Sequence, residues 1–93
     1  MPTYVLLSTL TQQGVQTLKS NPERLRAVNQ DVEELGCKVI HQWATLGEFD
    51  FVNVVEAPDV ETIARASLSI AARGSVRIET LPALDIDQFL RNF

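Results

Sequence analysis

His41 is the only histidine of the chain and the first side chain that could do acid–base chemistry. Histidine changes protonation near neutral pH, so it can serve as a general acid or base. Alternation along Cys37–Leu46 places His41 beside Trp43 on one face of an expected strand. Together with Asp50 the two rings could form a pocket wall, with His41 as proton carrier. The alternative interpretation is a half-buried, hydrogen-bonded histidine at an interface between subunits.

Three further polar residues belong to the same expected hairpin. Asp50 follows its turn. The Asp50 carboxylate could accept a hydrogen bond from a ligand amine or fix backbone N–H groups around Gly47, and we favour the structural role. Gln42 and Asn53 should face each other, and their amides could satisfy one another or donate to a ligand. The candidate ligand-binding set is therefore His41, Trp43, Asp50, Gln42 and Asn53.

Other kinds of chemistry find no support in the sequence. One histidine, without a cysteine or an acid at ligand spacing, does not supply three protein ligands, so no metal site is predicted. A Gly-rich phosphate loop, a Ser-His-Asp arrangement and a nucleophile motif are missing, and we expect no cofactor. Cys37, the single cysteine, lies in an apolar segment and is predicted to be a small core residue rather than a reactive thiol.

Composition predicts one soluble domain over residues 1–93. The hydrophobic fraction of 45% and the charged fraction of 22% are ordinary for such proteins. The net charge is −4 and the eight Lys and Arg residues are scattered, so we expect neither nucleic acid nor a membrane as a partner. A single cysteine, with no signal peptide or spanning segment, predicts a cytoplasmic protein.

The hairpin around Gly47 carries the clearest structural signal. A two-residue Gly47-Glu48 turn would join Cys37–Leu46 to Phe49–Ala57, with Gly47 at the positive φ of a type II′ turn. One face of this hairpin should pair Leu46, Ala44 and Ile40 with Phe49, Phe51 and Val55. The other should set Cys37, Val39, His41 and Trp43 against Val52, Val54 and Glu56. Both faces are largely apolar, whereas a sheet in a small monomer normally has one wet face. We therefore expect a second copy of the chain to cover one of them.

Capping residues and apolar spacing predict an α+β fold with the order βαββαβ plus a C-terminal helix. The first and fourth strands should be Thr3–Thr9 and Ser75–Leu81, and Val15–Ser20 a short helical turn. The two main helices should run from Asn21-Pro22-Glu23 to Gly36 and from Ala57-Pro58-Asp59 to Gly74. Asp85 should cap the last helix. Connection rules favour a ferredoxin-like fold, in which an antiparallel sheet of order 4-1-3-2 has both helices on one face.

Several segments resemble the GYD domain family of small, largely uncharacterised proteins. They are Met1–Leu10 (MPTYVLLSTL), Thr11–Gly14, Ser20–Leu25 (SNPERL), Thr45–Asp50 (TLGEFD) and Arg77–Leu81 (RIETL). Phe49 replaces the usual tyrosine of the family tripeptide, so a role for a phenol hydroxyl is absent there. The family is similar to the dimeric α/β-barrel group, in which two ferredoxin-like sheets pack face to face. The resemblance thus implies a homodimer or a higher oligomer.

A second resemblance, to the effector-binding domain of leucine-responsive (feast/famine) regulators, bears on function. It rests on Gly47-x-Phe49-Asp50, the Pro58–Gly74 helix and Val76…Thr80. Those domains oligomerise and bind amino acids between subunits. The present chain lacks a helix-turn-helix segment ahead of this module.

Two functions from different classes remain open. The first is a non-catalytic homo-oligomeric module that binds a small molecule at subunit interfaces. The second is a small dimeric α/β-barrel enzyme, a cofactor-independent monooxygenase or an isomerase, that uses His41 as its proton carrier. In that case Trp43 and Phe51 or Val52 would shape the cavity. A purely structural subunit is a third possibility.

Overall fold

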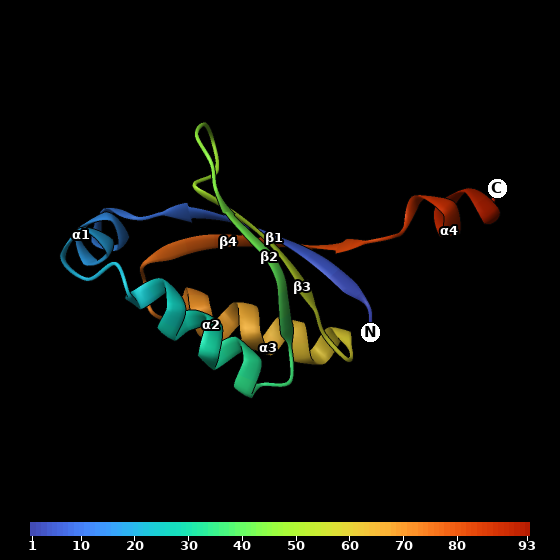
Figure 1. The fold of residues 1–93 in the computed structure, drawn as a ribbon, viewed down its shortest axis with the longest axis horizontal. Helices are drawn as coiled ribbons and strands as arrows, with labels where there is room; N and C mark the ends of the chain where they lie inside the picture. The colour runs from blue at the N-terminus through green and yellow to red at the C-terminus, as the bar shows by residue number, and fades with distance from the viewer.

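The computed structural model describes residues 1–93, which form four strands and four helices. In chain order they are β1 (Thr3–Leu10), α1 (Gln12–Ser20), α2 (Arg24–Glu34), β2 (Lys38–Ala44), β3 (Phe51–Glu56), α3 (Val60–Ala71), β4 (Val76–Ala83) and α4 (Ile86–Arg91). The strands make one antiparallel sheet in the order β2-β3-β1-β4 (Figure 1). This confirms the predicted α+β class and sheet order.

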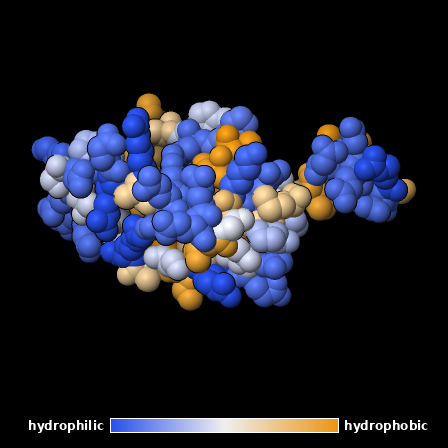
Figure 2. Space-filling model, turned by 60° about the horizontal axis from the view of Figure 1, so that its bottom comes forward, coloured by the Kyte–Doolittle hydropathy of each residue, from blue (hydrophilic) through white to orange (hydrophobic).

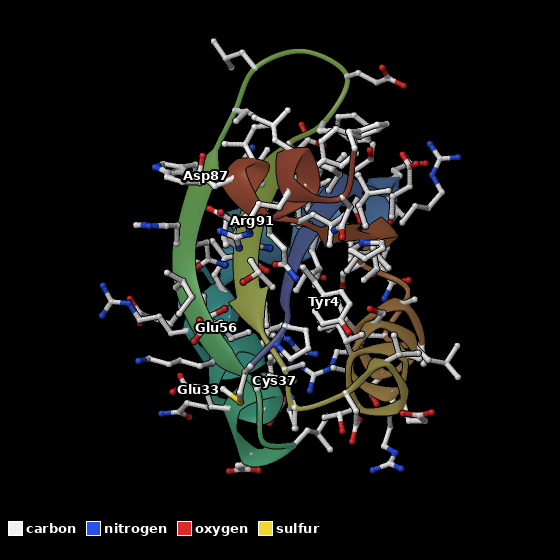
Figure 3. The ribbon with its side chains drawn as sticks, turned by 90° about the vertical axis from the view of Figure 1, so that its right-hand side faces the viewer. Tyr4, Glu33, Cys37, Glu56, Asp87 and Arg91 are labelled. Carbon is white, nitrogen blue, oxygen red and sulfur yellow. The ribbon has the colours of Figure 1, made fainter.

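The helices α2 and α3 lie on the same side of the sheet (Figure 1). Tyr4 and Leu6 of β1 and Val55 of β3 point toward this helix layer and are buried there. Tyr4 lies on the side that carries α3 (Figure 3). The helices α2 and α3 contribute Val32, Ile63 and Ala66 to the same core. Burial of these side chains holds the two layers together.

Local signals at the ends of α3 account for its position. The Asp59 carboxylate accepts hydrogen bonds from the hydroxyl and the backbone N–H of Thr62, at 2.6 and 2.8 Å. These bonds lower the pKa of Asp59. Gly74 follows the helix at φ +79°, a conformation that costs glycine little. Gly36 has φ +96° after α2, so both predicted helix ends are confirmed.

The predicted start of α2, with Asn21 as N-cap and Pro22 as first helical residue, was wrong by two residues. The helix begins at Arg24, and Glu23 occupies the N-cap position without a side-chain hydrogen bond. Asn21 is the C-cap of α1 instead, because its N–H donates to the Thr17 carbonyl. The short turn expected at Val15–Ser20 is a nine-residue helix.

A β-bulge changes the predicted faces of β2. Ala44 pairs with Phe51 and Gln42 with Asn53, as predicted, but the register then shifts between Val39 and His41. Val39 therefore lies opposite Val55, and Ile40 is the extra residue. The prediction that Ile40 faces Val55, with Val39 on the His41 face, was wrong. A bulge turns the strand locally, which here directs Val39 toward the core.

The turn between β2 and β3 is also longer than expected. Gly47 has the predicted positive φ, +124°, but pairing stops earlier, with a 2.8 Å bond from the Thr45 N–H to the Asp50 carbonyl. Leu46 is fully exposed and does not join the core.

Cys37 lies at the junction of α2 and β2 (Figure 3) and is a buried core residue, as predicted. Its predicted place on the His41 face was wrong, because it packs in the core between the sheet and the helices. Burial, and then the nearby charge of Asp59, raise the pKa of its thiol. The thiol therefore stays protonated, and weakly nucleophilic, at neutral pH.

The C-terminal segment stands away from the rest of the molecule. Beyond β4 the chain extends to α4, which buries no residue and projects from the body (Figure 1). Asp85 caps this helix as predicted, accepting from the N–H groups of Asp87 and Gln88. None of the four helices is both long and apolar enough to cross a bilayer.

Gly14 fixes α1 against the start of β4, and its replacement by alanine should destabilise the fold. A Cβ atom at Gly14 would collide with the backbone carbonyl of Ser75. Gly14→Ala should therefore lower the free energy of unfolding by about 1–3 kcal/mol, measured in urea. Gln16→Ala, at an exposed site of the same helix, should change it by less than about 0.5 kcal/mol. A helical glycine without such a contact gains stability on this change, so a more stable Gly14→Ala protein would contradict the assignment.

Candidate functional site

The face of the sheet opposite α2 and α3 carries a continuous apolar surface, here called the open face. Val5 pairs with Val54 on one side and with Leu81 on the other. Leu7 pairs with Val52, which pairs in turn with Trp43. Because paired residues point to the same side of a sheet, these six side chains are neighbours across all four strands.

No helix of the chain covers the open face (Figure 1). Trp43 is 49% exposed and Leu81 43%, at the two edge strands, while the four residues between them are half-buried. The helix-covered side presents a mostly hydrophilic surface (Figure 2). Monomeric proteins seldom leave contiguous apolar patches of this kind in water, and such patches mark interaction sites.

The structure brings His41 and Trp43 together on the open face. Their rings stack with centroids 5.0 Å apart and planes 15° from parallel. Both side chains are exposed in the single chain. The stack is a flat aromatic surface that could contact a second ring or a cation. The role of His41 as a proton carrier stays a prediction.

Asp50 lies apart from this pair and is held by the end of β1. Its carboxylate accepts from the backbone N–H of Leu10 at 2.8 Å, and its own N–H donates to the Ser8 carbonyl at 2.8 Å. Phe49 is bound through its carbonyl by the Thr45 hydroxyl at 2.6 Å. The Gly47–Asp50 turn is thus tied to β1 by a carboxylate contact that its sequence neighbours do not reveal.

Gln42 and Asn53 point to the helix side of the sheet, away from His41. They pair in the backbone register, but Gln42 exchanges two side-chain hydrogen bonds, at 2.8 and 3.2 Å, with Asn29 of α2. The Asn53 Oδ1 atom is buried and accepts no hydrogen bond. The five candidate ligand-binding residues therefore fall in three separate places, and their role in binding stays a prediction.

A second exposed apolar surface is the C-terminal arm, residues 84–93. Phe89 and Phe93 meet edge to face at 4.8 Å, and Phe93 is 88% exposed. The other exposed apolar side chains of the arm are Leu84, Ile86 and Leu90. Nowhere does the structure gather three or more His, Cys, Asp or Glu side chains that could hold a metal ion.

Sequence reasoning about the site missed the contributions of β1 and β4. It considered the hairpin alone, although Val5, Leu7 and Leu81 supply half of the open face. The signal was available, because Tyr4–Leu7 is apolar at four successive positions and so predicts a strand that is apolar on both sides.

The sequence and the fold of this chain are similar to those of known proteins. The sequence model of the GYD domain matches residues 4–92. A protein of Thermus thermophilus named "Glutamine synthetase and cystathionine beta-lyase binding protein" is 54% identical over 87 residues, which are 92% of each chain.

Two solved structures share the fold. The crystal structure of TTHA0845 from Thermus thermophilus superposes with a TM-score of 0.60 at 25% identity, over 91% of this chain and 95% of that one. The crystal structure of FFRP-DM1 gives a TM-score of 0.61 at 16% identity, over 90% of this chain and 100% of that one. Since the family match spans nearly the whole sequence, the chain belongs to the GYD domain family.

Proposed function

We propose that this protein is a non-catalytic, homo-oligomeric binding module in which a second copy of the chain covers the open face. The observation that carries the proposal is the apolar surface over all four strands, from Trp43 to Leu81. Two such faces packed together would form a dimeric α/β barrel. Hydrophobic burial would supply the driving force for this association.

A ligand pocket at this interface remains part of the proposal. The His41–Trp43 stack would lie between the two sheets and offer an aromatic wall to a small molecule. Asp50 is an unsuitable third wall residue, because it lies apart from the stack, where its carboxylate accepts from the Leu10 N–H at the end of β1.

We further propose that the assembled module binds other proteins, namely enzymes that correspond to glutamine synthetase and cystathionine beta-lyase. The support is the name of the Thermus thermophilus relative and its 54% identity over nearly the full length. If a twin occupies the open face, the C-terminal arm remains as a second apolar surface. A short helix with an exposed apolar side, like α4, is suited to a groove on a partner protein.

The emission of Trp43, the only tryptophan, should report whether the open face is covered. Exclusion of water from the indole moves its emission to shorter wavelength, so the native oligomer should emit at shorter wavelength than a fully diluted sample. Leu81→Asp should produce the longer-wavelength spectrum at any concentration, because a buried, unpaired carboxylate opposes association. Leu81 is three strand spacings from Trp43, at least about 14 Å, which makes a direct contact between the two side chains impossible.

Leu68→Asp is the matched control for this experiment. Leu68 is 72% exposed on α3, in the helix layer, so the same substitution there should leave the emission unchanged. If the emission of the native protein does not depend on concentration and matches that of Leu81→Asp, the open face is not a subunit interface.

Partner binding should depend on the arm rather than on the open face. In biolayer interferometry with the two enzymes from the same source organism, the native chain should bind at micromolar concentration. Phe93→Asp should weaken this binding at least about tenfold, the effect of losing one buried aromatic contact, and leave the oligomer intact. Leu68→Asp again serves as control. Full binding by Phe93→Asp would remove the arm from the contact, and no binding by the native chain would remove the enzymes as partners.

A further inference from the structure

The turn between β2 and β3 projects from the sheet on the same side as the open face. Figure 1 shows this turn pointing away from α2 and α3. Its outermost residues, Leu46–Glu48, are here called the tip, and Leu46 is fully exposed. A single exposed leucine is ordinary on a protein surface. This one, however, stands where a second copy of the chain would approach if it covered the open face.

A hollow lies beside the tip, near the end of β1 and the start of β4. It has a volume of about 190 Å³, and its border includes Leu7, Thr9, Phe49, Arg77 and Glu79. Leu7 pairs with Glu79 and Thr9 pairs with Arg77, so these four side chains share the open face. The Thr9 hydroxyl donates to the Glu48 carbonyl at 3.4 Å, which holds the tip beside β1. The hollow is therefore continuous with the open face.

The hollow is large enough for a leucine side chain. A cavity of about 150 Å³ is known to hold benzene, and the side chain of leucine has fewer carbon atoms than that ring. Leu7 and the Phe49 ring would offer it apolar contacts. Leu46 of the same chain is fully exposed and does not border the hollow. A leucine that fills it must therefore come from another chain.

A two-fold axis relates the positions of the tip and the hollow in the sheet. The strand order is β2-β3-β1-β4, with the tip in the β2–β3 half and the hollow in the β1–β4 half. Both lie at the same end, because Ser8 of β1 pairs with Phe51, directly after the turn, and with Ile78, next to Arg77.

Such an axis would run parallel to the strands, between the two packed faces and midway between β3 and β1. It would set each tip over the hollow of the other copy. Most protein dimers have two-fold symmetry, and packed sheets commonly keep their strands within about 30° of one another. The proposed dimer can therefore adopt this arrangement without any change in the chain.

The charges of the tip and the hollow are complementary. The two ion pairs of the chain involve other residues, so Arg77 in the hollow and Glu48 in the tip have no charged partner. Docking of the tip in the hollow of a second copy would bring this carboxylate to that guanidinium. Glu79 also borders the hollow, and a guanidinium has enough donors for two carboxylates.

We propose that the tip of each copy docks in the hollow of the other, with Leu46 against Leu7 and Phe49 and with Glu48 paired to Arg77. This inference rests on the proposed self-association and adds the symmetry axis and the residues that align the two faces. Burial of apolar surface is not directional, so on its own it would let one sheet slide or turn on the other. Two tips held in two hollows permit one alignment.

Leu46→Ala tests the apolar contact by sedimentation equilibrium of the full chain. Because Leu46 is fully exposed in the single chain, the substitution should not disturb the fold. The dissociation constant of the dimer should rise at least about tenfold, since the interface loses two buried leucine contacts. Leu68→Ala, at an exposed leucine of the helix layer, should leave the constant unchanged. An unchanged constant for Leu46→Ala would overturn the proposal.

Exchange of the two charges tests the ion pair. Glu48→Arg and Arg77→Glu should each weaken self-association, because like charges would then face each other across the interface. In an equimolar mixture of the two variants, native mass spectrometry should show mainly the mixed dimer, in which both contacts join opposite charges. If the two residues pair within one chain instead, mixed dimers will form only in the half share that random pairing gives, and this result would overturn the proposal.

Glu61→Arg and Arg65→Glu are the matched control for the mixture. Both residues are exposed on α3, and the two substitutions change the net charge by the same amounts. This control mixture should pair at random. A preference for mixed dimers here as well would show that net charge selects the partner, and it would also overturn the proposal.

The same experiments separate this inference from the proposed function. A native dimer that Leu81→Asp disrupts, but that Leu46→Ala and the charge exchange leave unaffected, would keep the open face as the interface and exclude the docked tip. A native chain that stays monomeric would refute the self-association and the docked tip together.

Discussion

A β-sheet that is apolar on both faces needs a cover on each of them, and this chain has enough helix for one. Tyr4, Leu6 and Val55 are buried under α2 and α3, whereas Val5, Leu7 and Val54, the alternate positions of the same strands, have no cover within the chain. The hydrophobic effect acts on both sets alike. This imbalance is the constraint from which the proposed self-association follows. It also explains why a chain of 93 residues with an ordinary composition exposes an apolar face to water.

The Gly47–Asp50 turn serves to complete the sheet. Gly47 supplies the positive φ, and Asp50 then joins the turn to β1 through one side-chain and one backbone hydrogen bond. These contacts continue the β1–β3 ladder beyond Ser8 and Phe51, its last pair. The replacement of tyrosine by Phe49 in the family tripeptide removes a hydroxyl but leaves this network intact, because the network uses only the carbonyl of that residue. The Asp50 side chain in this structure therefore stabilises the fold.

Patterns within short stretches of sequence predicted the features that depend only on neighbouring residues. Strand alternation, the Asp59 and Asp85 caps and the glycines after α2 and α3 led to the observed sheet order and to most element boundaries. The features that were predicted wrongly depend on contacts between residues far apart in the sequence. The bulge at Ile40 depends on how Val39 packs, the partner of Asp50 is 40 residues away at Leu10, and the amide that bonds Gln42 belongs to α2. Alternation predicted that Gln42 and Asn53 lie on the face opposite to His41 and Trp43, and they do. Asp50 was predicted beside the two rings but lies apart from them, because its carboxylate bonds the distant Leu10.

Sedimentation equilibrium of the purified native chain tests the central claim most directly. The account predicts a mass of at least twice 10.4 kDa at micromolar concentration, because an uncovered four-stranded apolar face is unstable in water. A well-folded particle of 10.4 kDa throughout the micromolar range would contradict it, since the open face would then be stable without a second copy of the chain.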